Sequence, residues 1–430
     1  MAQARTELHP SREIRHTGFL SAGTLDRAAQ SLLFRGLTRL SAGCLELHGA
    51  EGTRVFGDPT AALRAVATIH DPRTFRLGAL RGEVGLGEAY VEGLWDSPDP
   101  VQVVRLAVRN MAAFDRAAGP LAWLGKAISR LRHLRRGNTR SGARKNIAAH
   151  YDLSNDFYRL WLDESMTYSC AYFPRVGASL EEAQLAKFDR ICQKLRLTPG
   201  DHLLEIGTGW GGFAIHAARQ YGCRVTTTTI SAEQHALAVA RVAEAGLTER
   251  VSVLRQDYRD LAGSFDKAVS IEMFEAVGLE HYDTYFSAVD RLLKPGGCFL
   301  LQTITMNEQH FPEYIRSTDW IQQHVFPGAE LASLTEIHRS LARATTLSVF
   351  YMEDLGQHYA RTLEIWRARF QQSRSEVSAL GFNARFQRLW DWYLATCEGA
   401  FRERYIGVVQ MLLAKNGTAQ PPLDEPWETS

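Results

Sequence analysis

The sequence has few of the features that mark specialised classes of protein. Its six cysteines, spread over 430 residues, form no C-x-x-C pair, which argues against a disulfide scaffold and a zinc site and favours a reducing compartment. No apolar run approaches the length needed to cross a bilayer, and the N-terminal residues carry no apolar stretch typical of a secretion signal. With 49 basic against 48 acidic side chains, the net charge of +1 argues against a dedicated nucleic-acid-binding protein. We therefore expect a cytoplasmic protein without a metal site.

The length and composition favour two folded domains. A chain of 430 residues exceeds one ordinary domain, and 45% hydrophobic residues suffice for substantial cores. The patterns predict a polar N-terminal extension over residues 1–30 and a small α+β domain over 31–115. A larger domain is expected over 146–417, followed by a frayed polar tail over 418–430.

A basic segment connects the two domains. Residues 116–145 contain nine Lys or Arg residues, and no acidic residue lies between Asp115 and Asp152. Apolar residues at three- and four-residue steps make its first part a candidate amphipathic helix. Two interpretations stay open: a solvated linker, or an element that docks on anionic lipid, where each positive charge contributes roughly 1 kcal/mol.

From residue 202 onward the sequence alternates between strand and helix patterns. Strands are predicted at 202–206, 223–229, 251–254, 267–272 and 297–303. Amphipathic helices between them are predicted at 212–221, 232–245 and 283–293. This alternation is typical of an α/β fold with a parallel sheet and helices on both faces.

A glycine-rich loop follows the first of these strands. Gly207 and Gly209 allow a tight turn and close approach of the backbone to a ligand, and together with Gly212 they also satisfy the dinucleotide pattern G-x-G-x-x-G. Two observations favour a different ligand. Glu205 suits the amino group of an amino-acid ligand but would repel a pyrophosphate, and the next strand ends at 226–231 without the acid that a nicotinamide dinucleotide requires. The loop resembles that of the Rossmann-like methyltransferases, so S-adenosylmethionine is the expected cofactor.

Several further segments resemble the cyclopropane fatty acid synthase family, which includes the mycolic acid methyltransferases. They are GEAYVEGLWD (87–96), YDLSNDFYRLWLDESMTYSCAYF (151–173), TISAEQ (229–234), SIEMFEAVG (270–278), QTITMNEQHF (302–311), EDLGQHYARTLEIWRARF (353–370) and WYLATCEGAF (392–401). The resemblance implies a Rossmann-like class I methyltransferase domain with a smaller N-terminal α+β domain. It also implies transfer of a methyl group from S-adenosylmethionine to the cis double bond of an unsaturated phospholipid acyl chain, which gives a cyclopropane fatty acid.

The resemblance also implies how the reaction ends. Methylation of an alkene produces a carbocation, which aromatic faces stabilise, and in the family a bound bicarbonate is the base that removes a proton. Matched by motif, Glu275, Tyr359 and the backbone at Cys170 and Ile304 would hold this ion. A Glu275 carboxylate in an apolar stretch needs a partner or a raised pKa, and capping of free backbone N–H groups is its ordinary structural alternative.

Two positions leave alternatives open. Gln302 stands where the best-studied members of the family have histidine, and an amide orients an anion but takes up no proton. If proton loss from the transferred methyl group is slow, the product becomes a methylene- or methyl-branched chain; otherwise Gln302 simply replaces one hydrogen bond. Cys397 matches a cysteine once regarded as catalytic, but the chemistry needs no thiolate, so a structural role is favoured.

The cofactor contacts are also implied by the matched motifs. The expected set is Tyr151, Tyr168, Ser169, Glu205, Gly207, Gly209, Thr229, Gln234, Asp257 and Tyr258. Thr229 and Gln234 would face the ribose and methionine parts, and Asp257 and Tyr258 the adenine. The alternative for Asp257 is the ordinary role of an acidic loop residue at the end of a strand.

The expected partners follow from the implied substrate. They are unsaturated acyl chains and the anionic surface of a phospholipid bilayer, which would place the enzyme in the cytoplasm at the inner face of the cell membrane. A methyltransferase for a small soluble molecule and a lipid carrier without turnover are the alternatives. The sequence leaves open whether the chain works as a monomer or as a homodimer.

Overall fold

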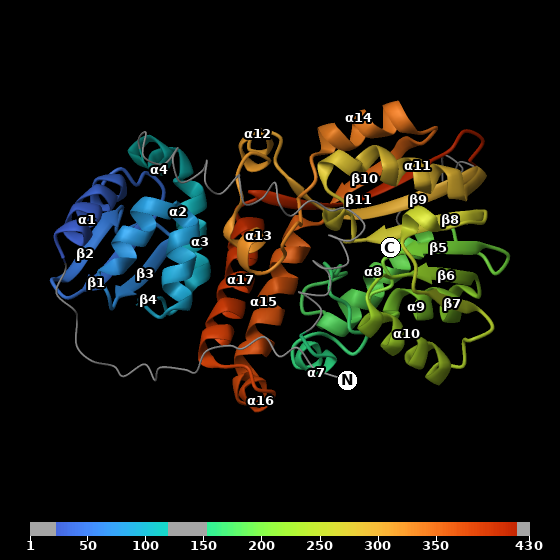
Figure 1. Cartoon of the computed structure of the whole chain (residues 1–430), viewed down its shortest axis with the longest axis horizontal. Coiled ribbons are helices and arrows are strands. Elements are labelled where there is room, and N and C mark those ends of the chain that lie inside the picture. Colours follow the sequence, from blue (N-terminus) through green and yellow to red (C-terminus); the bar gives the residue numbers. More distant parts are fainter. Residues whose placement is uncertain (1–22, 119–152, 419–430) are drawn as a thin grey trace, which may run out of the picture.

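The computed structural model describes residues 23–118 and 153–418, which form two domains side by side along the long axis of the molecule (Figure 1). Tyr151 and residues 119–145 of the basic segment lie outside the described residues. Within the described part, no helix is both long and apolar enough to span a membrane.

The N-terminal domain is a four-stranded sheet with four helices. Its strands are β1 (Cys44–Gly49), β2 (Gly52–Gly57), β3 (Arg64–Ile69) and β4 (Trp95–Asp96), in the order β2-β1-β3-β4. Its helices are α1 (Thr24–Leu37), α2 (Arg73–Val91), α3 (Pro100–Arg109) and α4 (Met111–Ala118). Strand β1 pairs antiparallel with β2 and parallel with β3, as in the predicted α+β class. Helix α1 begins at Thr24, inside the stretch predicted to be a polar extension.

The larger domain contains a seven-stranded sheet in the order β10-β11-β9-β8-β5-β6-β7. The strands are β5 (His202–Ile206), β6 (Arg224–Thr228), β7 (Val251–Leu254), β8 (Phe265–Ile271), β9 (Leu293–Met306), β10 (Ser348–Asp354) and β11 (Ile406–Ala414). The five strands from β9 to β7 are parallel, as predicted, whereas β10 and β11 pair antiparallel at the other end of the sheet. The sheet is therefore mixed rather than wholly parallel.

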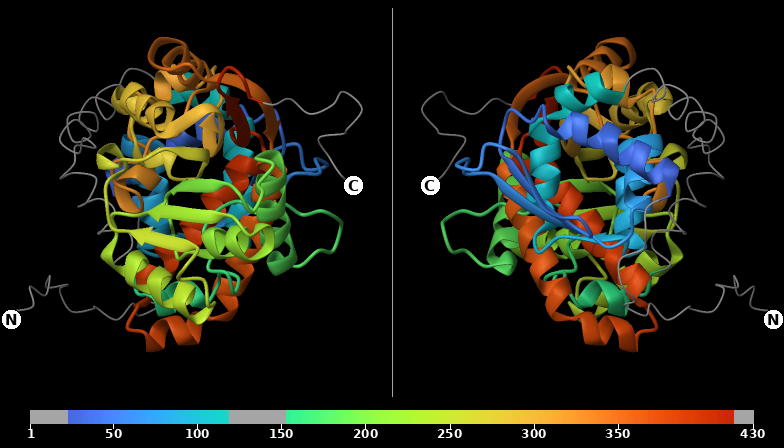
Figure 2. Two further views of the ribbon diagram at one scale, coloured as in Figure 1. Left: turned by 90° about the vertical axis from the view of Figure 1, so that its right-hand side faces the viewer. Right: turned by 90° about the vertical axis from the view of Figure 1, so that its left-hand side faces the viewer.

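Helices cover both faces of this sheet, as the end-on views of Figure 2 show. Leu203 and Leu204 on β5 point to opposite faces, because side chains alternate along a strand. Leu203 packs with α8 (Leu180–Lys194), α9 (Gly212–Tyr221) and α10 (Ala232–Glu244). Leu204 packs with α11 (Tyr282–Leu292) and α14 (Leu334–Ala344). The remaining helices are α7 (Asn155–Arg159), α12 (Phe311–Tyr314), α13 (Trp320–His324), α15 (Gly356–Gln372), α16 (Arg374–Ala379) and α17 (Ala384–Arg402), with short 3₁₀ turns η1 (Tyr258–Asp260), η2 (Phe274–Ala276) and η3 (Leu279–His281).

Local sequence explains where the helices near the site begin. Ser231 follows the β-branched strand β6 and is the N-cap of α10, where its side chain accepts a hydrogen bond from the backbone N–H of Gln234. Ser179 and Glu182 form a capping box at the start of α8. These caps fix the first turns of the helices that flank the glycine loop.

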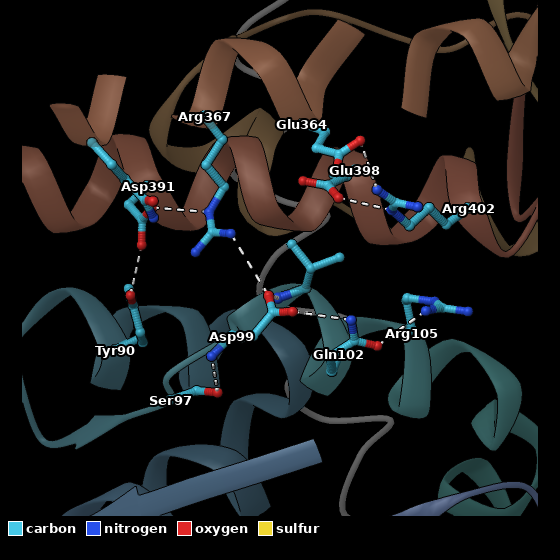
Figure 3. A network of polar contacts seen from close by, with 12 residues as sticks. Tyr90, Ser97, Asp99, Gln102, Arg105, Glu364, Arg367, Asp391, Glu398 and Arg402 are labelled. Atoms are coloured by element: carbon cyan, nitrogen blue, oxygen red, sulfur yellow. Dashed lines mark hydrogen bonds and ion pairs between the residues drawn. The ribbon is translucent and has the colours of Figure 1, made fainter. Parts of the chain in front are cut away.

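Helices α15 and α17 lie between the sheet and the N-terminal domain, and polar side chains join α17 to that domain (Figures 1 and 3). The Tyr90 hydroxyl donates to Asp391 over 2.8 Å, and Arg367 donates to the same carboxylate over 3.0 Å. A side chain at Gly87 on α2 would lie 2.6 Å from the rings of Trp320 and Trp392, so glycine permits the close approach. The N-terminal domain is thus packed tightly onto the larger one.

The strand order reverses at β5. The chain runs outward from β5 through β6 to β7 and then returns to the other side of β5 with β8. In open α/β sheets, ligands bind at the carboxyl ends of the strands where the order reverses. We therefore expect the ligand site at the residues that follow β5 and β8.

Candidate active site

The glycine loop follows β5 and leaves its backbone accessible. Gly207 and Gly209 have φ angles of 106° and 52°, which favour glycine. The N–H groups of Gly207 and Thr208 donate to the carbonyl of Thr228 at the end of β6, which holds the loop in place. A side chain at Gly209 would meet no described atom within 4 Å, whereas one at Gly207 would lie 3.0 Å from Cβ of Met273. The loop therefore borders open space on one side and the segment after β8 on the other.

Glu205 supplies an incomplete polar site beneath this loop. Its side chain is buried, and among the described residues its Oε2 atom has no hydrogen-bond partner. Burial raises the pKa of Glu205 to about 8, although Thr227 and the charge of the buried Lys187 act in the opposite direction. An unpartnered buried carboxylate oxygen is costly unless a ligand donates to it. The residues present thus fit the amino group of S-adenosylmethionine, approached across the open backbone of the loop.

Three other residues that were predicted to contact the cofactor form hydrogen bonds within the protein. Thr229 donates to Oε1 of Gln234 over 2.9 Å at the start of α10. Ser169 accepts a hydrogen bond of 2.7 Å from the buried Lys187 ammonium. The hydroxyl of Tyr168 shares a hydrogen bond of 2.8 Å with that of Tyr393.

Asp257 and Tyr258 follow β7 and begin the turn η1. Asp257 accepts hydrogen bonds from the backbone N–H of Arg259 over 3.0 Å and from its guanidinium over 2.6 and 2.8 Å. Burial raises the pKa of Tyr258 to about 12, and its ring centre lies 5.2 Å from that of Tyr285. These contacts support the ordinary loop role of Asp257 and leave an adenine contact as a prediction.

Glu275 lies on the turn η2 after β8 and binds the backbone of β9. Its Oε1 atom accepts hydrogen bonds from the N–H of Ile304 over 2.5 Å and from the hydroxyl of Thr303 over 3.0 Å. Its Oε2 atom is buried and unpartnered within the described part of the chain. Burial, followed by the negative charge of Glu272, raises the pKa of Glu275 to about 8. Burial and the neighbouring charge therefore favour the neutral, protonated form of this side chain.

Glu272 is the first residue after β8, and it lies at the centre of a network. Its Oε1 accepts hydrogen bonds from the N–H of Cys170 over 2.8 Å and from Nε2 of Gln302 over 2.7 Å. Its Oε2 accepts one from the Tyr359 hydroxyl over 2.7 Å. Burial raises the pKa of Glu272 even though these three hydrogen bonds lower it. Glu272 has a φ angle of 48°, which is uncommon for any residue but glycine.

A chain of buried amides fixes the orientation of Gln302. Its Oε1 accepts from Nε2 of Gln410 over 2.9 Å, and Oε1 of Gln410 accepts from the Lys194 ammonium over 2.6 Å. Both glutamine side chains are buried. Because the ammonium can only donate, the amide groups are aligned and Gln302 must present its N–H to Glu272.

These contacts bear on the expected bicarbonate site. The N–H of Cys170, the hydroxyl of Tyr359 and the amide of Gln302 all bind the Glu272 carboxylate, and the N–H of Ile304 binds Glu275. The donor groups therefore already have carboxylate partners, and the described residues do not fit a bound bicarbonate ion at this place.

The two cysteines in the predicted set do not form an activated thiolate. The Sγ–H of Cys170 donates to the carbonyl of Ala171 over 3.2 Å. Burial raises the pKa of the Cys170 and Cys397 thiols, which disfavours ionisation. Across residues 23–118 and 153–418, no group of three or more His, Cys, Asp or Glu side chains could hold a metal ion.

Sequence reasoning missed Glu272 and Lys187. Glu272 stands inside the segment SIEMFEAVG directly after an apolar strand, where a functional acid is expected, but the family motif drew attention to Glu275. Lys187 falls on the buried stripe of α8, four residues after Ala183 and four before Ile191. A lysine on an otherwise apolar helix face was the available signal.

Comparisons with known proteins show the family of this chain. The profile of a family described as mycolic acid cyclopropane synthetase matches residues 138–411. The tuberculostearic acid methyltransferase UfaA1 of Mycobacterium tuberculosis (strain ATCC 25618 / H37Rv) is 39% identical over 399 residues, which are 90% of this chain and 91% of the relative. The cyclopropane-fatty-acyl-phospholipid synthase of Escherichia coli (strain K12) is 38% identical over 379 residues, or 86% of this chain and 92% of the relative.

A solved structure shows the same fold in the larger domain. The mycolic acid cyclopropane synthase CmaA1, complexed with SAH and CTAB, superposes with a TM-score of 0.59 at 36% identity and covers 63% of this chain and 98% of its own. Its likeness agrees with the α/β fold of the larger domain. This chain therefore belongs to the mycolic acid cyclopropane synthetase family and is an S-adenosylmethionine-dependent methyltransferase that acts in lipid modification.

Proposed function

We propose that this enzyme transfers the methyl group of S-adenosylmethionine to the cis double bond of unsaturated acyl chains in phospholipids. The observation that carries the proposal is the position of Glu272 and Glu275 beside the glycine loop, where Met273 reaches the Cβ position of Gly207. This edge combines a site for a donor with two carboxyl groups and aromatic rings. The name of the Escherichia coli relative supports the phospholipid substrate.

The cofactor, when bound, supplies an electrophilic methyl group on a sulfonium. The chain's own residues would hold it: Oε2 of Glu205 would accept a hydrogen bond from its amino group, and the backbone at Gly207 and Gly209 would lie against it. Thr229 and Gln234 face its ribose and methionine parts. Tyr168 and Ser169, with Tyr151, Asp257 and Tyr258, complete the proposed set.

Aromatic rings next to Glu272 suit a cationic reaction. The ring centre of Tyr359 lies 4.5 Å from that of Phe401 and 6.0 Å from that of Trp366, and Tyr168 lies 5.4 Å from Trp366. A carbocation on a methylated acyl chain is stabilised by such ring faces, by about 2 kcal/mol for a desolvated contact.

Two kinds of product are consistent with this step. Loss of a proton from the transferred methyl group closes a cyclopropane ring. A hydride shift that moves the cation to the methyl-bearing carbon allows two other outcomes: loss of a proton from the methyl group gives a methylene branch, and loss from a neighbouring chain carbon gives a methyl-branched alkene. Two observations support a branched product: the glutamine at position 302, and the similarity to a relative named tuberculostearic acid methyltransferase.

We also propose that the enzyme is cytoplasmic and works as a peripheral protein on anionic phospholipid. The support is the excess of positive charge in residues 116–145, read from the sequence. Weaker sedimentation with anionic vesicles at high salt than at low salt would agree with this docking. Equal sedimentation at both salt concentrations would contradict it.

The test of the function uses vesicles of dioleoyl phosphatidylglycerol and S-adenosylmethionine labelled in its methyl group. We expect label in the extracted acyl chains, one added carbon by mass spectrometry of the methyl esters, and no label with a saturated lipid. Hydrogenation of the methyl esters then separates cyclopropanes from branched alkenes. Label that never enters the lipid fraction would contradict the proposal.

A further inference from the structure

Glu272 lies where a reacting chain and a bound donor would meet. It follows β8 directly, at the switch point of the sheet, and the next residue, Met273, contacts the position above Gly207. The residue as a whole is of intermediate exposure. Resting on the proposed function, we propose that the Glu272 carboxylate is the base that takes the proton from the methylated acyl chain, in place of a bound bicarbonate ion.

The two glutamates after β8 differ in their hydrogen bonds, which indicates that they have different roles. Both oxygens of Glu272 accept hydrogen bonds, which suits an ionised carboxylate. Only Oε1 of Glu275 accepts any, so its buried Oε2 is free to carry a proton. The negative charge of Glu272 raises the pKa of Glu275, so the two groups do not ionise together easily, and the hydrogen bonds favour the charge on Glu272.

The three groups that donate hydrogen bonds to Glu272 are neutral, and the buried Lys187 ammonium lowers its pKa by charge alone, whereas burial raises it. A backbone N–H, an amide and a phenol orient the carboxylate without the full charge compensation that an arginine would give. The aligned amides of Gln302 and Gln410 also explain why glutamine suits position 302. An amide holds the carboxylate and does not compete with it for the proton.

The step balances without a further reactant. Methyl transfer to the alkene leaves a carbocation on the acyl chain and a neutral thioether as the leaving group. A C–H bond of the cation then breaks, and its proton forms an O–H bond with a Glu272 oxygen. The electron pair of that C–H bond closes the third bond of a cyclopropane or forms a C=C bond, according to where the cation lies and which carbon loses the proton.

The variant Glu272→Gly offers a sharp test because φ is already in the region that favours glycine, so the change adds no backbone strain. It frees the N–H of Cys170, the hydroxyl of Tyr359 and the amide of Gln302 for an external anion. We expect wild-type enzyme to turn over dioleoyl phosphatidylglycerol equally well in carbon-dioxide-free buffer and with added bicarbonate. We expect Glu272→Gly to lose activity by roughly 100-fold or more without bicarbonate, the usual contribution of a general base, and to recover with it.

A binding measurement makes the test independent of the acyl substrate. In calorimetry with bicarbonate alone, we expect heat of binding for Glu272→Gly and none for wild type, while both bind S-adenosylmethionine alike. Bicarbonate binding by wild type, or full activity of Glu272→Gly in carbon-dioxide-free buffer, would overturn the proposal. If no lipid is labelled by wild type, the proposed function fails, and the calorimetry alone still decides whether Glu272 occupies the anion site.

Discussion

Buried carboxylates in two regions of this molecule have opposite surroundings. At the domain interface, Glu403 binds Arg105 and Arg109 over 2.6 and 2.5 Å, and although burial alone would raise the pKa of Glu403, the two arginines lower it. At the carboxyl ends of β5 and β8, burial raises the pKa of Glu205 and Glu275 to about 8. The first kind of carboxylate stays ionised and joins the domains.

This difference separates carboxylates that stabilise the structure from carboxylates that are suited to chemistry. Glu353 lies close to the site but bonds to Arg190 over 2.6 Å and to Lys194, and the two cations lower its pKa in spite of burial. Through Lys194 and Gln410 it helps to orient the network that ends at Glu272. Carboxylates compensated by cations hold the structure, whereas those held by neutral groups keep a titratable proton for chemistry.

The largest expected effect is on turnover. Glu272→Gln keeps the size of the side chain but cannot accept a proton, so we expect the rate of label transfer into lipid to fall roughly 100-fold or more. Calorimetry should show nearly unchanged affinity for S-adenosylmethionine. The matched control, Glu403→Gln, removes a carboxylate of the interface and should leave the rate of the folded enzyme unchanged. An equal loss of rate in the two variants would contradict the distinction between site carboxylates and interface carboxylates.

The next effect is on cofactor affinity. Glu205→Gln removes a carboxyl group whose ionised form a bound cationic amino group would stabilise, and a hydrogen bond to a charged group contributes about 1.5–3 kcal/mol. We therefore expect roughly 10- to 100-fold weaker binding of S-adenosylmethionine by calorimetry. Normal affinity in this variant would mean that Oε2 of Glu205 does not face the amino group.

A third effect is on stability as a function of pH. Glu275 ionises near its usual value of 4.5 in the unfolded chain but near 8 in the folded enzyme, so between these values ionisation favours unfolding as pH rises. Glu275→Gln cannot ionise and escapes this loss. Its stability relative to wild type should increase across that pH range by at most about 1.4 kcal/mol per pH unit and stay constant below it. Denaturant unfolding at several pH values checks this, and a constant difference throughout would show that Glu275 is ionised in the fold.

The smallest effect concerns the interface itself. Glu403→Gln should lower the free energy of unfolding by about 1–2 kcal/mol, because it removes charge-assisted hydrogen bonds to two partly exposed arginines. The loss should shrink at high salt. A salt-independent loss would indicate altered packing instead.

Much of the fold could be predicted from the sequence where local signals are strong. The strands 202–206 and 251–254 and the helix 212–221 begin and end as predicted, because apolar or β-branched runs there are bounded by loop and glycine residues. The antiparallel strands β10 and β11 were not predicted. Strand β11 reads as a buried apolar run after two long helices, and nothing local shows that it returns to pair with β9.

The candidate site was predictable only in part, for a physical reason. The glycine loop and Glu205 are contiguous in sequence, so their role follows from one motif. The network of Glu272 joins it to Cys170 and Tyr359, which lie 102 and 87 positions away. Such contacts exist only after the sheet has formed, and sequence spacing gives no sign of them.

The account's central claim is that the enzyme carries its own base beside the donor site. The most direct measurement is the rate at which wild type labels dioleoyl phosphatidylglycerol, first in buffer freed of carbon dioxide and then with bicarbonate restored. The account predicts the same rate in both. A rate that collapses in the first buffer and returns with bicarbonate would contradict it.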